Sequence, residues 1–169
     1  EWATIELNQI CDVFRGSQFS KADILENGIK KCIHYGELFT KYNETIFEII
    51  SRTNKKDGFE SKIGDVLMPS SDVTPNGLAK ASAIMLDDVI LGGDMNVLRP
   101  KLDVDLYSIF LCYLLIYSKA EIIKLVSGTT VKHIYASQII NCKVPIINSL
   151  KEQQKIASCL SSLDELITV

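Results

Sequence analysis

The sequence predicts an α+β fold, in which a bent, mostly antiparallel sheet holds a buried helix and a further helix protrudes at the C-terminus. Before Pro100, short apolar runs alternate with loops rich in Gly, Asp, Asn and Ser, a pattern typical of short strands. After Pro100, the apolar residues follow a helical period. The C-terminal segment adds a helix-capping motif and heptad spacing.

The first part of the chain is a series of strand-like segments. Ala3, Ile5 and Leu7 alternate with polar residues, as on a strand with one buried face. The apolar runs on either side of Asp87-Asp88 predict a hairpin formed by residues 83–86 and 89–91. The other expected strands are residues 10–14, 31–35, 45–50, 66–68 and 95–99.

The second part begins with a long helix. We expect Asp105 to cap it, with the helix running to about Ser127 and stopping at Gly128. Its first turns are apolar nearly all round, which predicts a buried helix. A strand-like run follows at residues 139–147.

The last predicted helix has the clearest start. Ser149 and Glu152 form a capping box, and apolar residues then recur at steps of four, three and four, which is a heptad seam. Because the predicted seam has no partner in this sequence, we expect it to pack against another helix. We therefore divide the chain into a domain at 1–147 and the start of a spacer helix at 148–169. The seam residues are Ile156, Leu160, Leu163 and Ile167.

Composition restricts the class of protein. With 169 residues, 47% of them hydrophobic, the chain has enough apolar material for a sizeable core. Its five cysteines are scattered without a CxxC pair, and no segment resembles a signal peptide or a membrane span, so we expect a reduced, cytoplasmic protein without a zinc site. The net charge of −3 suggests that the chain alone would bind a polyanion weakly.

Six motifs, in this order, resemble the type I restriction-modification DNA specificity (S) subunits, and specifically one target recognition domain of such a subunit. The GTTVKHI segment after the apolar helix is the most informative of them. One departure is Ile146-Ile147-Asn148, which stands where family members often carry a second proline. The motifs are residues 2–16, 33–38, 64–68, 128–134, 139–145 and 152–157.

The resemblance implies a non-catalytic protein that reads one half of a bipartite DNA site. Its helices would dock methyltransferase (M) subunits, and a restriction (R) subunit would complete the complex. The chain itself would need no cofactor, whereas S-adenosylmethionine, ATP and Mg²⁺ would serve the partner subunits. A full specificity subunit resembles two such domains, so this chain would be a piece of one, or a half-subunit that forms a homodimer through its terminal helix.

Several loops are candidate contacts to double-stranded DNA, because they combine glycine with short hydroxyl, amide and cationic side chains. An ordinary helix cap or polar turn is the alternative for the 128–133 loop. A solvated loop is the alternative at 15–21, a strand end at 41–42, and a plain hairpin loop at 70–80; Gly93 to Asn96 is expected to be a turn that fixes strand register. The candidates are Arg15, Ser17, Gln18, Lys21, Lys41, Tyr42, Ser70, Ser71, Asp72, Lys80, Gly128, Thr129, Thr130, Lys132 and His133.

Two other functions remain open from the residues alone. One is a protein-interaction module that acts through the heptad helix. The other is a metal-dependent nuclease that uses Asp57, Glu60 and Lys62, which imitate part of an acid-and-lysine nuclease site. The two histidines are not in metal-ligand spacing, and we find no nucleotide-binding or hydrolase motif.

Overall fold

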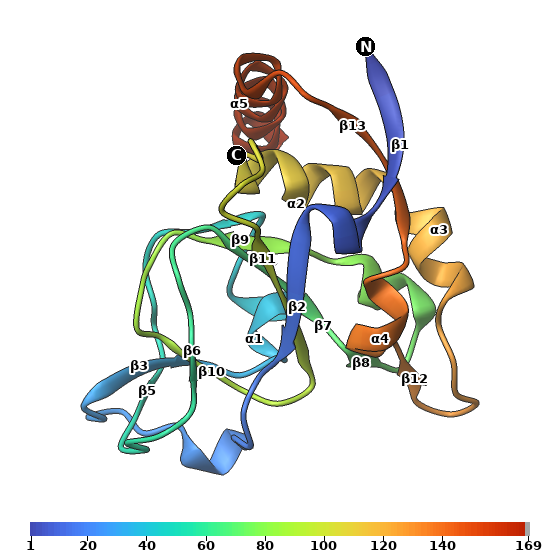
Figure 1. Cartoon of the computed structure of the whole chain (residues 1–169). Coiled ribbons are helices and arrows are strands. Elements are labelled where there is room, and N and C mark those ends of the chain that lie inside the picture. Colours follow the sequence, from blue (N-terminus) through green and yellow to red (C-terminus); the bar gives the residue numbers. More distant parts are fainter. Residues whose placement is uncertain (168–169) are drawn as a thin grey trace.

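A computed structural model describes residues 1–167 and shows the predicted α+β fold (Figure 1). The strands are β1 Trp2–Glu6, β2 Cys11–Arg15, β3 Lys30–Ile33, β4 Thr45–Ile46, β5 Arg52–Thr53, β6 Phe59–Glu60, β7 Asp65–Pro69, β8 Ser71–Asp72, β9 Ser82–Ile84, β10 Ile90–Leu91, β11 Met95–Pro100, β12 Lys132–His133 and β13 Lys143–Ile147. The helices are α1 Glu37–Thr40, α2 Ser108–Tyr117, α3 Lys119–Lys124, α4 Ala136–Ile139 and α5 Leu150–Ile167.

The strands form several small sheets. The largest has the order β2-β11-β7-β9-β4 and is antiparallel except where β4 runs parallel to β9. A second sheet, β5-β3-β10-β6, carries the loops at the end of the molecule opposite α5 (Figure 1). Two ladders, β1 with β13 and β8 with β12, join the N-terminal half of the chain to its C-terminal half.

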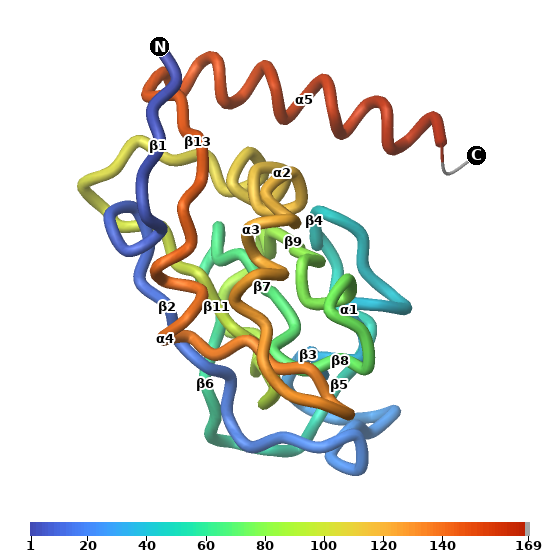
Figure 2. The backbone as a smooth tube through the Cα atoms, turned by 90° about the vertical axis from the view of Figure 1, so that its right-hand side faces the viewer, coloured from blue at the N-terminus to red at the C-terminus, as the bar shows by residue number. Residues whose placement is uncertain are grey.

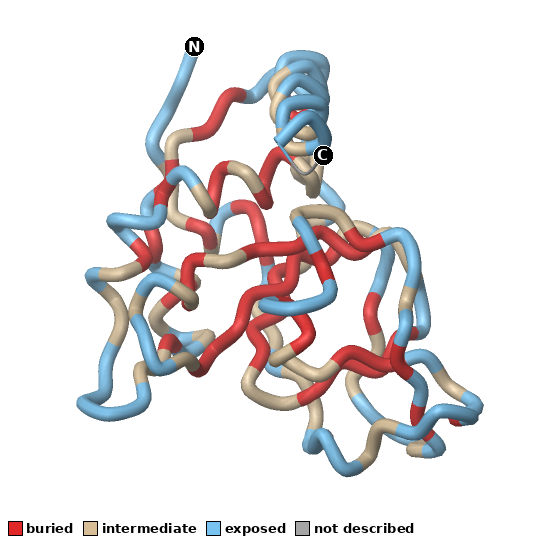
Figure 3. Tube along the Cα trace, turned by 180° about the vertical axis from the view of Figure 1, so that it is seen from behind, coloured by how far each residue is buried: buried red, intermediate tan, exposed pale blue. Residues whose placement is uncertain are grey.

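Strand β7 shows why the central sheet is buried on both faces. Val66 and Met68 pack into the cluster around α2, whereas Leu67 packs into a second cluster between the two larger sheets. Successive side chains of a strand point to opposite faces, so a strand with apolar matter on both sides is a continuous apolar run. Figure 3 shows these buried strands inside an exposed layer of loops.

The predicted buried helix is present but shorter and broken. Helix α2 begins at Ser108, not at Asp105, and α3 follows after Ser118, whose ψ of 16° interrupts the helical path. Phe110 and Leu115 are almost fully buried, in agreement with the all-round apolar pattern. Helix α3 ends at Lys124, so Gly128 does not stop a helix; it lies in the loop before β12.

Three strand predictions were wrong in detail. Residues 83–86 and 89–91 do not pair with each other, because β9 joins the central sheet and β10 joins the second sheet. Only Thr45–Ile46 of the 45–50 run is a strand. The 139–147 run contains the end of α4 before β13. In each case, pairing with distant strands decided the outcome, and local pattern does not encode it.

Helix α5 lies across α2 and is fastened at its first turns (Figure 2). The Gln153 side chain is fully buried: it accepts a hydrogen bond from the Tyr107 amide at 2.8 Å and donates to the carbonyls of Ile147 at 2.7 Å and Asp105 at 3.0 Å. The Ser149 hydroxyl accepts from the Glu152 amide at 3.4 Å, as the capping pattern predicts.

Across residues 1–167, none of the helices combines the length and apolar character that crossing a bilayer would require.

Candidate nucleic-acid interface

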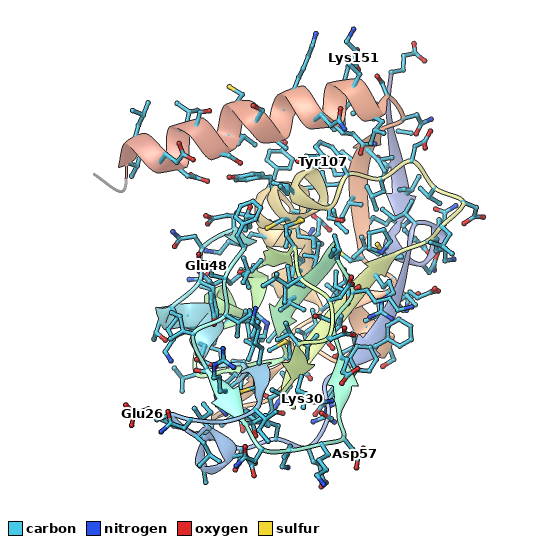
Figure 4. The ribbon with its side chains drawn as sticks, turned by 90° about the vertical axis from the view of Figure 1, so that its left-hand side faces the viewer. Glu26, Lys30, Glu48, Asp57, Tyr107 and Lys151 are labelled. Atoms are coloured by element: carbon cyan, nitrogen blue, oxygen red, sulfur yellow. The ribbon has the colours of Figure 1, made fainter. Side chains whose placement is uncertain are left out.

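The polar loops predicted to contact DNA gather mainly at the end of the molecule that lies far from α5. In Figure 1, β8, β12 and the second sheet lie at the bottom and α5 lies at the top. The side-chain view in Figure 4 agrees, with Lys30 and Asp57 at one end and Lys151 of α5 at the other.

The loop before β12 is a closed turn. Ser127 and His133 exchange backbone hydrogen bonds at 2.8 and 2.9 Å, and Gly128 adopts a φ of +100°. A Cβ at Gly128 would lie 2.1 Å from the Val131 carbonyl oxygen, so the turn needs glycine for its own closure. The Lys132 ammonium donates to the carbonyls of Gly128 and Thr129 at 2.8 and 2.7 Å, which holds this cation against its own loop.

His133 is also held within the fold. Its Nδ1 lies 2.9 Å from the Ser71 hydroxyl, and its ring stacks at 5.9 Å on the ring of Tyr135. The backbone of Ile134 pairs with Ser70, while Thr129 and Thr130 stay exposed. The most informative motif of the sequence therefore forms a rigid corner between β8 and β12, with its two threonines at the surface.

The segment before β11 joins this corner to the loop at residues 15–21, called here the Arg15 loop. The carbonyl of Asp94 accepts from the Ser70 amide at 2.7 Å, and the carboxylate of Asp94 pairs with Arg15 at 3.2 Å. Asp94 adopts a φ of +57°, which is uncommon for a residue other than glycine. The sequence predicted only a register-fixing turn here; the structure adds a carboxylate that positions a candidate DNA contact.

An open cleft of about 420 Å³ lies between the Arg15 loop, the end of β3 and the loop after β5. The Gln18 side chain is exposed there, and no hydrogen bond engages its amide in the part of the chain that the structure describes. Lys55 donates to the Gln18 carbonyl at 2.7 Å and lies 3.4 Å from Asp23, so it is partly neutralised. The lining residues are Arg15, Gln18, Phe19, Ser20, Asp23, His34, Tyr35, Lys55, Gly93 and Asp94.

His34 also lines this cleft. From the sequence, the two histidines were considered only as possible metal ligands. The Nδ1 of His34 accepts from the Gly36 amide at 3.2 Å, so the neutral ring carries its proton on Nε2. Burial lowers the pKa of His34 below its usual value, and the nearby Glu37 carboxylate opposes that shift only in part. The ring is therefore neutral at physiological pH, with one fixed N–H donor.

The second sheet carries two exposed cations that face each other. Lys31 and Arg52 are directly opposed across β3 and β5, and neither has an acidic partner within residues 1–167. Like charges at directly opposite positions destabilise a sheet. An anion between them would relieve this repulsion, so the pair is a candidate phosphate contact that sequence reasoning missed. Strand pairing was the missing information.

Several predicted contact residues are committed to the fold. Tyr42 is 7% exposed and its hydroxyl accepts from the Ile50 amide, so this side chain is engaged within the domain. Lys41 is bound by Glu37 at 2.7 Å and by Ser51 at 3.1 Å. The Ser17 hydroxyl donates to the Leu91 carbonyl at 3.2 Å.

The remaining candidates differ in accessibility. Ser70 and Ser71 are each 7% exposed, and their role as DNA contacts stays a prediction. The Asp72 carboxylate accepts from the Val73 amide and the Thr74 hydroxyl at 2.7 and 2.9 Å. Lys80 is half-buried at the end of the 3₁₀ turn at 75–79, whereas Lys21 is exposed.

The predicted heptad seam is divided by its surroundings. Ile156 and Leu160 line an apolar groove of about 460 Å³ together with Trp2 and Phe110, so the first half of the seam packs on its own domain. This corrects the expectation that the whole seam lacks a partner within the chain. In the second half, Leu163 and Ile167 are 49% and 82% exposed, as is Leu166 at 73%.

The nuclease residues do not form a site. The Glu60 carboxylate accepts from the Lys30 ammonium at 2.7 Å. Among residues 1–167, no group of three or more His, Cys, Asp or Glu side chains is arranged to hold a metal ion. The nuclease alternative therefore gains no support from the geometry.

Polar turns lie at one end of this α+β domain, and a helix with an exposed apolar edge lies at the other. The family model for the type I restriction modification DNA specificity domain matches residues 1–169, and the chain belongs to this family. The prediction of a non-catalytic specificity unit is thereby confirmed at the level of the family.

The relatives are longer than this chain. It is 27% identical to the type I restriction enzyme MjaVIII specificity subunit of Methanocaldococcus jannaschii, an alignment that covers 100% of this chain and 41% of that subunit. The S subunit structure from M. genitalium superposes with a TM-score of 0.72 at 20% identity, over 98% of this chain and 39% of that one. The HsdS subunit from Thermoanaerobacter tengcongensis gives 0.67 at 20%, over 99% and 38%. The chain thus spans about two fifths of its relatives' length.

Proposed function

We propose that this chain reads the base sequence of double-stranded DNA, as one half of a bipartite recognition site in a type I restriction-modification complex. The observation that carries the proposal is the chain of hydrogen bonds that fixes the β8–β12 corner, Asp94 and the Arg15 loop as one rigid surface. Rigid polar turns satisfy the geometric demand of base readout, since hydrogen bonds to base edges require fixed donors and acceptors.

The charges of this chain support the proposal that it and its partner subunits make different kinds of contact with DNA. Of the cations near the surface, Arg15, Lys30, Lys41 and Lys55 have acidic partners and Lys132 is held by carbonyls. Lys21, Lys31 and Arg52 are exposed and have no acidic partner in the part of the chain that the structure describes. With a net charge of −3, the chain contributes base identity more than phosphate affinity. Methyltransferase (M) subunits would supply the remaining phosphate contacts, and the restriction (R) subunit would act on the bound DNA.

The test is binding to duplex DNA as a function of salt. Fluorescence anisotropy with a random duplex pool should show weak binding by the chain alone and tight binding once a methyltransferase subunit is added. Replacing the chain with a relative of different loop sequence should change the sequences selected from the pool. If neither the chain nor its complex discriminates among duplexes, the proposal fails and a pure interaction module is favoured.

We also propose that the exposed end of α5 docks partner helices. Leu163 is the better probe than Leu160, because Leu160 also packs in the groove beside Trp2 and its loss would disturb the chain's own domain. Leu163→Lys should weaken assembly with the methyltransferase subunit, measured by analytical ultracentrifugation. Gln154→Lys is the matched control, because Gln154 is exposed on the opposite side of the helix. Equal assembly of both variants would contradict the docking role, and loss of self-association alone would identify the partner as a second copy.

The remaining expectations belong to the same proposal. The chain needs no cofactor of its own, S-adenosylmethionine, ATP and Mg²⁺ are used by the partner subunits, and the complex acts in the cytoplasm. Residues 1–147 would form the target recognition domain and residues 148–167 would begin the spacer helix; the last two residues of that predicted segment, 168–169, lie outside the described residues.

A further inference from the structure

We infer that Arg15, positioned by Asp94, reads a guanine in the major groove of the target. The inference rests on the proposed function and assigns a base to one part of that surface. Guanine presents two acceptors, N7 and O6, on its major-groove edge, and the forked guanidinium group is the commonest protein partner for them.

The Arg15–Asp94 pair is arranged for recognition and contributes little to stability. Its side chains are 64% and 47% exposed, and such exposed pairs contribute little to folding. Only one contact is made, from Nη2 of Arg15 to Oδ1 of Asp94 at 3.2 Å, so the guanidinium keeps further N–H donors for a ligand. The pair lowers the rotamer freedom of Arg15 before binding, which reduces the entropic cost of a bidentate contact.

The backbone holds Asp94 firmly enough for this role. Its φ of +57° costs free energy for a residue with a Cβ, and its carbonyl is tied to the Ser70 amide at 2.7 Å. Gly16 on the other side donates to the Met95 carbonyl at 3.1 Å, so the Arg15 loop and the Asp94 turn are fixed to each other.

The neighbouring groups favour guanine over adenine. His34 lines the same cleft and carries its proton on Nε2, because Nδ1 accepts from Gly36. A cleft that offers N–H donors from Arg15 and His34 complements the two acceptors of guanine. Adenine presents an amine at the position of O6, which would meet these donors unpaired.

The test uses the full-length protein in its assembled complex, with three point variants. Duplexes are selected from a random pool by the wild type and by Arg15→Ala, Arg15→Lys and Asp94→Asn. We expect the wild type to require guanine at one position, and Arg15→Ala and Arg15→Lys to lose that preference by roughly 10- to 100-fold. Arg15→Lys keeps the charge but lacks the fork, so it should retain the salt dependence of binding. Asp94→Asn tolerates the same φ and should weaken the preference partly.

A modified base separates readout from a merely structural effect. Replacing that guanine with 7-deazaguanine removes the N7 acceptor, so it should weaken binding by the wild type and leave Arg15→Ala unaffected. If Arg15→Ala instead weakens all duplexes equally and lowers the salt slope by about one, Arg15 contacts a phosphate and the inference fails, while the proposed function stands. If the wild type shows no base preference at any position, both fail.

Discussion

The β8–β12 corner and the Arg15 cleft lie at the same end of the molecule but differ in how their polar groups are used. In the corner, Lys132 is held by two carbonyls of its own loop and His133 by Ser71. In the cleft, the Gln18 amide makes no hydrogen bond among the described residues and Arg15 makes one. The corner resembles a scaffold, and the cleft has the unsatisfied donors and acceptors that a ligand requires.

This difference between the corner and the cleft shows what the motif that identifies the family does in the structure. Gly128 and His133 belong to the segment that most clearly identified the family, and the structure uses both to close a turn. A specificity domain must keep its frame while its target changes. We therefore expect the identifying motif to maintain the frame and the less distinctive Arg15 loop to choose the base.

The largest expected effect is on the stability of the corner. Gly128→Val would place a β-branched residue at a φ of +100° with its Cβ 2.1 Å from the Val131 carbonyl oxygen. We expect the free energy of unfolding to fall by on the order of 3 kcal/mol, measured by urea denaturation. Thr129→Val, in the exposed neighbour, should leave stability within about 0.5 kcal/mol. A Gly128 variant of normal stability that lost DNA binding would reverse the comparison and make the corner the reading surface.

The next largest effect is on the preference for one base, which we assign to the cleft. Gln18→Ala should cost roughly 1–3 kcal/mol for the preferred base at one position. The unfolding free energy should stay unchanged, because the Gln18 side chain is exposed and makes no hydrogen bond among the described residues. Competition binding between duplexes that differ at that position measures the cost. Thr130→Val in the corner is the matched variant; a larger change in base preference from it than from Gln18→Ala would contradict the assignment.

The sequence predicted the fold class and the buried helix because both depend on apolar periodicity, which is local. It did not predict burial, which packing between elements decides: Tyr42 is 7% exposed, and its hydroxyl accepts from the Ile50 amide. The opposition of Lys31 and Arg52 and the Arg15–Asp94 pair join residues far apart in the chain, so no local pattern contains them. The start of α5 after Ser149 and the spacing of its apolar seam were predictable because both depend on residues only a few positions apart in the chain.

A smaller effect is expected on the salt dependence of DNA binding, which should differ between cations without a partner and cations held by hydrogen bonds. Lys31→Ala and Arg52→Ala should each lower the salt slope of DNA binding by about 0.9, because each removes one phosphate contact. Lys132→Ala should lower it by less, because two carbonyls of its own loop hold the Lys132 ammonium. Anisotropy titrations at several salt concentrations measure all three slopes. A slope that falls most for Lys132→Ala would show that its ammonium leaves the loop to bind DNA.

The smallest effect is a pH dependence of stability that arises from His34 in the cleft. Because burial holds the pKa of His34 below its ordinary value of 6.5, the fold favours the neutral ring. The unfolded chain then binds more protons, so this contribution is complete above the ordinary pKa and is lost as the pH falls through it. Protonation of Nδ1 would also remove the hydrogen bond from Gly36.

His34→Asn tests this directly, since the asparagine oxygen takes the place of Nδ1 as an acceptor for the Gly36 amide. Urea midpoints between about pH 5.5 and 7.5 should fall with acid in the wild type and fall less in the variant. Gln18→Ala, in the same cleft, is the matched control and should keep the wild-type dependence, because it removes no titratable group. If His34→Asn keeps that dependence as well, the acid-sensitive group lies outside the cleft, and the distinction between a closed corner and an open cleft loses its chemical basis.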